Sequence, residues 1–290
     1  AITDHGVMYG VIDFYRAARE AGINPVLGCE VYVAPASRFD REIGSGDDRY
    51  YHLVLLAENN QGYANLMKIV SKSFVEGFYY KPRVDLQLLE KYHEGLIALS
   101  ACLAGEVARY LTRGMYEDAK AAALRYQDIF GKGNFFLELQ DHGIPEQQNV
   151  NQQLLKMHRE TGIELVATND VHYTLAEDAQ PHDVLLCLQT GKKLSDENRM
   201  RYEGGQYYVK SPEEMERLFP YATEALENTH KIAQRCHVEI EFGVTKLPKF
   251  DVPEGYTSWE YLNELCFKGL EERYPSVTEE LTERLNYELS

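Results

Sequence analysis

Two residues with metal-binding side chains follow an apolar segment near the middle of the sequence. The segment spans residues 163–167, and Asp170 and His172 come shortly after it. On an extended chain, side chains two residues apart point to the same side. A carboxylate beside an imidazole can bind one divalent metal ion. Taken alone, this Asp-x-His pair is better explained by a capping aspartate beside a surface histidine, so its meaning depends on the rest of the chain.

Metal-binding side chains recur at or near one end of five further apolar segments. These residues are His5, Glu30, His52, Cys102 and His142. Where strand ends on one face of a barrel converge, the side chains that they carry meet in one site. The recurrence therefore predicts a shared metal site. His52 opens its segment instead of ending it, and His142 lies three residues past its segment and is expected to be structural.

The types of ligand define the chemistry of such a site. Imidazole, carboxylate and thiolate ligands together favour zinc, manganese or iron over calcium. Two or three such ions would polarise a phosphoryl oxygen and lower the pKa of bound water toward about 7, which makes phosphate-ester hydrolysis the natural reaction. The sequence contains no Walker A motif, no GxGxxG and no GxSxG, so it gives no support to the chemistries that those motifs serve.

The composition is that of an ordinary globular chain with a strong acidic excess. The 290 residues are 44% hydrophobic and 26% charged, and the formal net charge is -16. That charge opposes broad non-specific binding of nucleic acid, although a local groove can still be basic. No apolar run approaches the roughly 20 residues that cross a bilayer, so no membrane association is expected. Five scattered cysteines without a CxxC pair fit a reducing cytoplasm.

Apolar segments alternate with amphipathic stretches up to Ala167. Strands are predicted at 1–2, 25–33, 52–57, 96–100, 135–139 and 163–167, and helices at 9–21, 60–73, 104–111, 116–130 and 145–161. Alternation of this kind predicts parallel strands joined by crossover helices. Six strands, with at least one more expected before Ala1, favour a closed barrel over an open sheet.

The alternation of predicted strands and helices ends after Tyr173. Helices are predicted at 178–188, 212–219, 221–236 and 258–273, and no strand alternates with them. The segment 243–255 contains two prolines and is predicted to be a linker. This prediction places a domain boundary near Pro248. We therefore expect one domain at 1–247 and the beginning of another at 248–290, within a chain that is a fragment of something longer.

Two loops are expected near the strand ends. Residues 34–48 follow the segment that carries Glu30, and this loop is expected to cover part of the site. Residues 77–85 combine aromatic and basic side chains. This composition fits either a packed loop with cation–aromatic contacts or a surface that stacks on bases and pairs with phosphates. In the second case Lys81 and Arg83 would contact DNA.

Six stretches carry a resemblance to a known family. They are AITDHGVMYG at 1–10, GCEVYV at 28–33, YHLVLLA at 51–57, SACLAGE at 100–106, TNDVHY at 168–173 and YYVKSPEEM at 207–215. Together they resemble the PHP (polymerase and histidinol phosphatase) domain of bacterial DNA polymerase III alpha subunits, the C-family DNA polymerases. The last stretch is more typical of the alpha subunits than of free phosphatases. The family's first motif, an HxH strand, is missing here.

The resemblance implies both a fold and a site. The fold is a distorted seven-stranded (βα) barrel of PHP type, with its first strand missing from this chain, followed by helices that lead into a polymerase palm. The implied metal ligands are His5, Glu30, His52, Cys102, Asp170 and His172, and we expect His5, Asp170 and His172 to act in catalysis. Asp4 is expected either to cap the chain or to support a ligand. Two or three zinc, manganese or iron ions are expected here, and magnesium at a polymerase site outside the chain.

The resemblance also implies a function. The parent would be a replicative, DNA-directed DNA polymerase, and this part a metal-dependent 3′–5′ exonuclease for proofreading. One alternative is an inactive scaffold that stabilises the polymerase and docks a separate exonuclease subunit. A second is a stand-alone phosphoesterase of the histidinol-phosphatase kind. Expected partners are primer-template DNA, the sliding clamp, the clamp loader and a separate exonuclease subunit.

Overall fold

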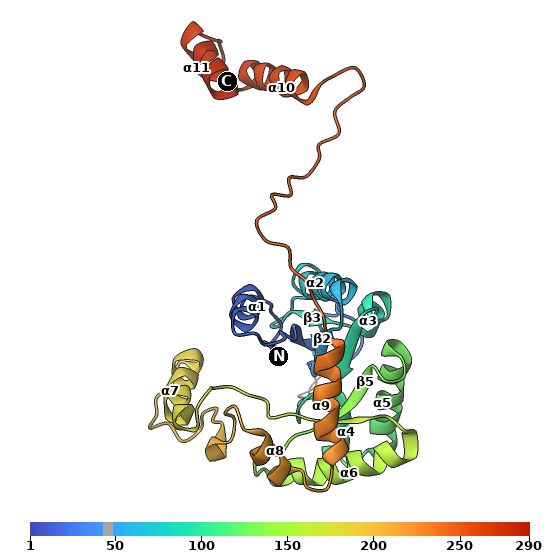
Figure 1. The fold of residues 1–290 in the computed structure, drawn as a ribbon. Helices are drawn as coiled ribbons and strands as arrows, with labels where there is room; N and C mark the ends of the chain where they lie inside the picture. The colour runs from blue at the N-terminus through green and yellow to red at the C-terminus, as the bar shows by residue number, and fades with distance from the viewer. Residues whose placement is uncertain (43–48) are drawn as a thin grey trace. The chain divides into compact units, whose positions relative to one another are not determined.

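A mixed six-stranded sheet organises the first part of the chain (Figure 1). The computed structural model describes residues 1–42 and 49–290, so the end of the loop predicted at 34–48 lies outside the described residues. The strand order is β3-β1-β2-β4-β5-β6. The strands are β1 (Gly28–Val33), β2 (Tyr51–Ala57), β3 (Arg83–Val84), β4 (Leu96–Leu99), β5 (Phe135–Leu139) and β6 (Leu165–Ala167).

The strands are not all parallel, and the sequence-based prediction is wrong on this point. Strand β2 runs antiparallel to both β1 and β4, whereas β4, β5 and β6 are parallel to one another. No helix joins β1 to β2 among the described residues, and a pair without a crossover connection returns antiparallel. The start of β2 therefore lies beside the end of β1, with His52 opposite Tyr32.

The segment before β1 contributes single bridges instead of a full strand. Ile2 pairs with Leu27, and His5 pairs with Glu30, both in parallel orientation. The edges of the six-stranded sheet are β3 and β6. The described strands thus form an α/β fold consistent with the expected barrel type, but they do not show ring closure.

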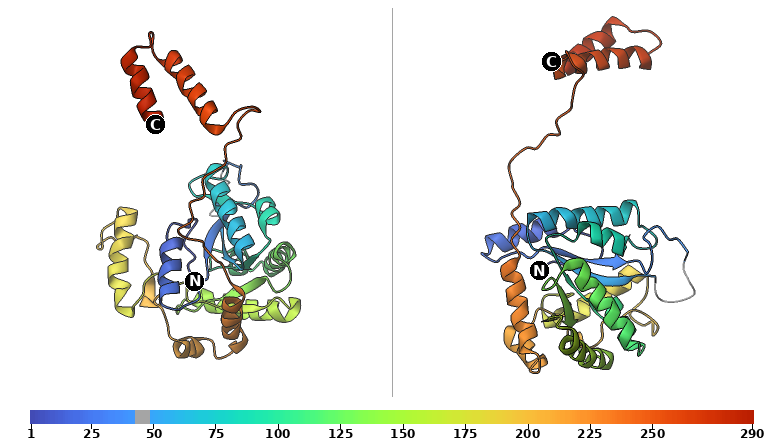
Figure 2. Two further views of the ribbon diagram at one scale, coloured as in Figure 1. Left: turned by 45° about the horizontal axis from the view of Figure 1, so that its top comes forward. Right: turned by 90° about the vertical axis from the view of Figure 1, so that its right-hand side faces the viewer.

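Alternate residues of the strands face two different environments. One set, which includes Leu55 and Leu137, packs against the helices α2 to α6. The other set, which includes Val54 and Val166, packs with Ile232 of α9. Figure 2 shows this helix beside the sheet in both views. The helices are α1 (Val11–Glu20), α2 (Asn60–Val75), α3 (Leu86–Tyr92), α4 (Glu106–Thr112), α5 (Tyr116–Phe130), α6 (Pro145–Thr161), α7 (Ala179–Thr190), α8 (Pro212–Leu218) and α9 (Thr223–Arg235).

Local signals explain where these helices begin and end. The Asn59 side chain accepts a hydrogen bond from Gly62 N and so caps α2. Helix α6 starts at Pro145, which has no amide proton to leave unpaired, and ends at Gly162 in the left-handed conformation. These residues are visible in the sequence, which is why the predicted helix bounds lie close to the observed ones.

The chain divides into two compact units, Ala1–Glu239 and Ile240–Ser290. The division falls somewhat before Pro248. The second unit contains α10 (Ser258–Arg273) and α11 (Glu279–Leu289). That this unit begins a polymerase palm stays a prediction. In the part of the chain that the structure describes, no helix is long and apolar enough to cross a membrane.

Candidate metal centre

The carboxylate of Glu30 lies between two imidazoles. Its Oε1 is 2.7 Å from His52 Nδ1, and its Oε2 is 3.1 Å from His5 Nδ1. Each residue offers one ligand atom, and these three atoms lie within 4.8 Å of one another. Glu30 stands on β1, His52 on the adjacent antiparallel β2, and His5 on the segment that bridges to β1. Sheet pairing therefore fixes all three.

Cys102 joins this group from the turn after β4. Its Sγ lies 3.7 Å from His52 Nδ1 and 4.0 Å from Glu30 Oε1. The preceding Ala101 has a φ of 63°, an uncommon conformation for a residue with a Cβ. Gly105 closes the turn, because its amide donates to the Cys102 carbonyl oxygen at 2.9 Å. The strained turn directs the thiol toward the histidine and the carboxylate.

Asp170 and His172 reach the site through a turn, and not along an extended strand as predicted. Strand β6 ends at Ala167, and Asp170 has a φ of 44°. The His172 ring donates from Nδ1 to the Asp170 carbonyl oxygen at 2.7 Å, and the His172 amide donates to the Tyr207 carbonyl oxygen at 2.9 Å. The segment around Tyr207 thus holds the turn in place.

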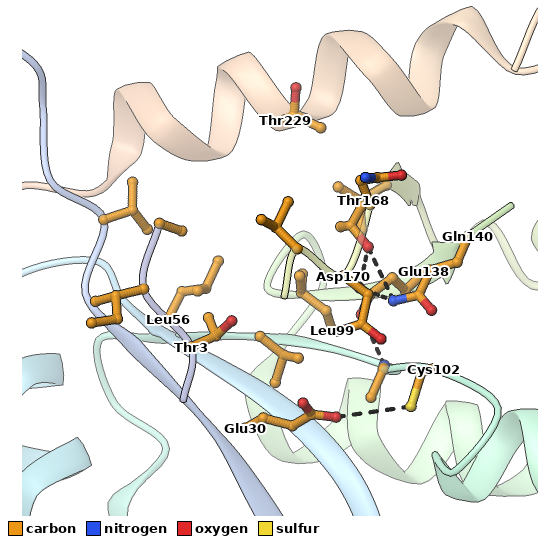
Figure 3. A pocket seen from close by; sticks show the side chains of 18 of the residues that line it. Thr3, Glu30, Leu56, Leu99, Cys102, Glu138, Gln140, Thr168, Asp170 and Thr229 are labelled. Atoms are coloured by element: carbon orange, nitrogen blue, oxygen red, sulfur yellow. Dashed lines mark hydrogen bonds between the residues drawn. The ribbon is translucent and has the colours of Figure 1, made fainter. Parts of the chain in front are cut away.

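A cavity of about 610 Å³ brings these elements together (Figure 3). Five of the six predicted ligand residues line it: His5, Glu30, Cys102, Asp170 and His172. The sixth, His52, contacts Glu30 from β2. The rings of His5 and His172 are 6.0 Å apart, centroid to centroid. Figure 3 shows the side chains of Glu30, Cys102 and Asp170 directed into the same space.

Burial and neighbouring charged groups both shift the pKa values of the side chains in this cavity. Burial raises the pKa of Asp170, and the Glu30 carboxylate raises it further. Burial also raises the pKa of Glu30, but hydrogen bonding to His52 and the nearby imidazoles outweigh it and bring that pKa below its ordinary value. Burial lowers the pKa of His5 and raises that of the Cys102 thiol well above its usual range. The site therefore places two carboxyl groups, Glu30 and Asp170, close together, with their pKa values shifted in opposite directions.

This donor set fits a divalent cation. A cation would relieve the repulsion between Glu30 and Asp170, lower the pKa of the Cys102 thiol and bind neutral imidazole. His5, Glu30 and His52 are already close enough to share one ion. Residues Cys102, Asp170 and His172 are the side chains that could complete its coordination or hold a second ion.

The other predicted site residues have different positions. The Asp4 carbonyl oxygen accepts from Glu30 N at 3.0 Å, so this residue supports β1 through its main chain. Lys81 lies with its ammonium 5.4 Å from the centre of the Tyr32 ring. Arg83 is only 5% exposed, and its guanidinium donates to the carbonyl oxygens of Gly77, Arg38 and Asp40. These contacts give Arg83 a structural role in the loop, and the expected contact with DNA stays an untested prediction.

His142 is structural, as its distance from the strand suggested. Its side chain is buried, and both ring nitrogens have partners. Nε2 donates to the Asn169 carbonyl oxygen at 2.9 Å, and Nδ1 accepts from the Gln147 side chain at 2.8 Å. His142 thereby fixes the turn that presents Asp170.

Two residues near the site were not found from the sequence. Glu138 is buried in β5, where its carboxylate accepts from Ala101 N and from the Thr168 hydroxyl. A charged residue inside the run Phe135–Leu139 is a signal that could have found it. Tyr202 donates toward His172 from a distant loop, and no local pattern marks it.

Comparison with known proteins defines the class. The PHP domain family matches residues 1–142, a range that contains His5, Glu30, His52 and Cys102. Residues 1–142 are thus similar to the PHP domain family.

Three relatives that the chain matches along nearly its whole length carry the same name. The chain is 46% identical over 290 residues to the DNA polymerase III subunit alpha of Treponema pallidum, and 47% identical over 292 residues to that of Borreliella burgdorferi. Both alignments cover 100% of this chain and 25% of the relative. The subunit from Thermus aquaticus is 45% identical over 287 residues, which cover 96% of this chain and 23% of the relative. The chain is thus similar along its whole length to the N-terminal part of these subunits and spans about a quarter of their length.

Proposed function

We propose that this chain is the N-terminal part of a DNA-directed DNA polymerase and that its PHP domain removes mispaired nucleotides from primer 3′ ends. The observation that carries the proposal is the position of Glu30 between His5 and His52, with Cys102, Asp170 and His172 facing the same space. A scaffold would have no need to keep so many metal-binding side chains together in a cavity.

We propose that two groups of residues bind different metal ions. His5, Glu30 and His52 would hold one divalent ion, and Cys102, Asp170 and His172 would hold the remaining ion or ions. When bound, such ions polarise a phosphoryl oxygen and lower the pKa of coordinated water. We propose zinc, manganese or iron here and magnesium at the polymerase site outside these 290 residues.

Lys81 and its neighbours would guide the DNA strand to this cavity. The Tyr32 ring lies 5.4 Å from the Lys81 ammonium and 6.3 Å from the His5 ring, measured between centroids for the two rings. Tyr80 beside Lys81 is 66% exposed. A lysine pairs with backbone phosphates, and an exposed tyrosine stacks on an unpaired base. Primer-template DNA is therefore the proposed substrate, and the clamp, the clamp loader and a separate exonuclease subunit are proposed partners, in a cytoplasmic complex.

The test is excision of a mispaired primer end by the full-length protein without nucleotides, with and without added zinc or manganese. Asp170→Asn should abolish excision and leave polymerisation intact. Asp128→Asn, on an exposed position of α5, is the matched control and should retain both activities. Absence of metal-dependent excision by the wild type, with polymerisation intact, would instead identify the domain as a scaffold. Efficient hydrolysis of a small phosphomonoester by the wild type would point to the phosphatase alternative.

A further inference from the structure

Tyr202 reaches the candidate metal centre from the loop between α7 and α8. Its hydroxyl oxygen lies 3.1 Å from His172 Nε2. Its ring packs on His172 at 4.4 Å between centroids, with His182 at 5.1 Å and Tyr207 at 4.8 Å. The packing from three sides fixes the direction of the hydroxyl.

The hydrogen-bond partners of His172 indicate which ring nitrogen carries the lone pair that a cation would bind. A carbonyl oxygen can only accept a hydrogen bond, so the contact with the Asp170 carbonyl places the ring proton on Nδ1. In the neutral ring, Nε2 then carries the lone pair, and the Tyr202 hydroxyl donates to it. Histidine ligands commonly donate their other ring N–H to a carbonyl in this way. The hydroxyl therefore occupies the lone pair that a metal ion would use.

Tyr202 also lies within electrostatic reach of acidic groups of the candidate site. Burial raises the pKa of this phenol to about 12, and the nearby acidic groups of Asp170, Cys102 and Glu30 raise it further. The hydroxyl lies 3.1 Å from His172 Nε2, and a phenol O–H can donate one hydrogen bond at a time. A donor beside the ligands suits the oxygen of a phosphate group better than it suits a cation.

We propose that Tyr202 is a positioning residue whose hydroxyl has two successive partners. Before a metal ion binds, the hydroxyl donates to His172 Nε2 and keeps this nitrogen directed into the cavity. If Nε2 held a divalent ion, the hydroxyl would lose that acceptor and would donate to a non-bridging oxygen of the phosphate to be cleaved. This inference rests on the proposed phosphodiesterase function.

The first measurement is the manganese affinity of full-length Tyr202→Phe and wild-type protein, by titration calorimetry in the absence of DNA. The variant lacks a hydrogen bond that the ion must break, so it should bind manganese about 2- to 10-fold more tightly, the worth of one ordinary hydrogen bond. A purely structural tyrosine predicts equal or weaker binding. Equal or weaker binding would overturn the proposal.

The second measurement is the affinity for dAMP, the kind of product that excision releases, at saturating manganese. Loss of a hydrogen bond to a charged oxygen should weaken dAMP binding by roughly 10-fold or more in Tyr202→Phe. Unchanged dAMP affinity would also overturn the proposal. Tyr208→Phe is the matched control, because it removes a phenol hydroxyl of the same loop region that bonds Glu214 at 2.6 Å. Both affinities should stay at the wild-type value in this control.

The two proposals fail in different ways. Wild-type protein that binds no manganese at this site would contradict the proposed function itself. Wild-type protein that binds manganese and excises, beside a Tyr202→Phe variant that does not show both changes, would contradict only the role of Tyr202.

Discussion

Glu30 and His52 meet at 2.7 Å although their strands run in opposite directions. In the register of β1 and β2, Glu30 lies opposite Val54 and His52 lies opposite Tyr32. The two residues are therefore diagonal neighbours on one face of the sheet, a distance that long side chains can bridge. Antiparallel pairing places His52, at the start of β2, next to Glu30 in the middle of β1.

Glu30→Gln should weaken zinc binding more than the roughly 10- to 100-fold that loss of an outer hydrogen-bond partner costs. The amide keeps the shape of the side chain but removes the negative charge between His5 and His52. Zinc affinity is measured by competition with a chelator of known affinity. Glu106→Gln is the matched control, since Glu106 is also buried but pairs with Arg125 and Tyr126. Equal zinc affinity of Glu30→Gln and wild type would remove Glu30 from the ligand set.

Gly105→Ala should disturb the metal centre because the turn has no room for a side chain. A Cβ at Gly105 would lie 2.1 Å from the Ser100 carbonyl oxygen, so the turn that carries Cys102 must shift. We expect a loss of about 1–3 kcal/mol in unfolding free energy and of about 10- to 100-fold in zinc affinity. Chemical unfolding and zinc titration measure the two effects.

Gly62→Ala is the control that distinguishes a general loss of stability from a specific loss of zinc affinity. A Cβ at Gly62 would lie 1.7 Å from the Gly95 carbonyl oxygen, at the start of α2. This variant should be destabilised by a similar amount but keep the zinc affinity of the folded protein. If both glycine variants lose zinc affinity equally, the effect of Gly105 is one of general stability.

Lys81→Ala and Arg83→Ala should behave differently although the two residues are close in sequence. Lys81→Ala should weaken binding of single-stranded 3′ ends and reduce the slope of log affinity against log salt by about 0.7, the value for one phosphate contact. Arg83→Ala leaves buried carbonyl oxygens without donors and should cost about 1–3 kcal/mol of stability. Fluorescence anisotropy across a salt series and chemical unfolding distinguish them. A stable Arg83→Ala variant with weakened DNA binding would restore Arg83 as a DNA contact.

Local signals in the sequence were enough to predict most helices and the residues around the site. Caps such as Asn59 and Pro145 mark helix ends, and apolar runs such as 135–139 mark buried strands, so both are visible without tertiary structure. The grouping of His5 with Glu30 followed from one rule, that strand ends carry functional residues.

Features that depend on contacts between distant residues could not be predicted in the same way. The direction of β2 depends on its connection to β1, which periodicity does not show. The left-handed conformation of Asp170 is held by His142 and by the segment near Tyr207. Arg83 looked like a surface cation because its burial depends on carbonyl groups that only the folded loop brings together.

Glu138 links the two strained turns of the metal centre. Its Oε2 accepts from Ala101 N at 2.9 Å, and its Oε1 accepts from the Thr168 hydroxyl at 2.5 Å and from Gln140 Nε2 at 3.2 Å. Ala101 precedes Cys102, and Thr168 lies two residues before Asp170, and both Cys102 and Asp170 are proposed metal ligands. One buried carboxyl group therefore holds both ligand-bearing turns through hydrogen bonds.

Glu138 should make the metal-free chain less stable as the pH rises. Burial, with the charges of Glu30 and Asp170, raises the pKa of Glu138 from 4.5 to about 7. Between these values the unfolded chain has released the proton that the folded chain still binds, so the unfolding free energy falls as the pH rises. The loss should reach up to about 3 kcal/mol above pH 7.

Glu138→Gln cannot titrate, so it provides the reference for this effect. Urea unfolding of both chains with a chelator present, at pH 5 and pH 8, gives the difference in stability at each pH. At pH 5, just above the unfolded pKa, the wild type should keep most of its advantage, because its folded carboxyl group is still protonated. At pH 8 that advantage should shrink, because the wild type then folds with a buried charge. A difference that does not change with pH would show that Glu138 is ionised in the folded protein throughout this range.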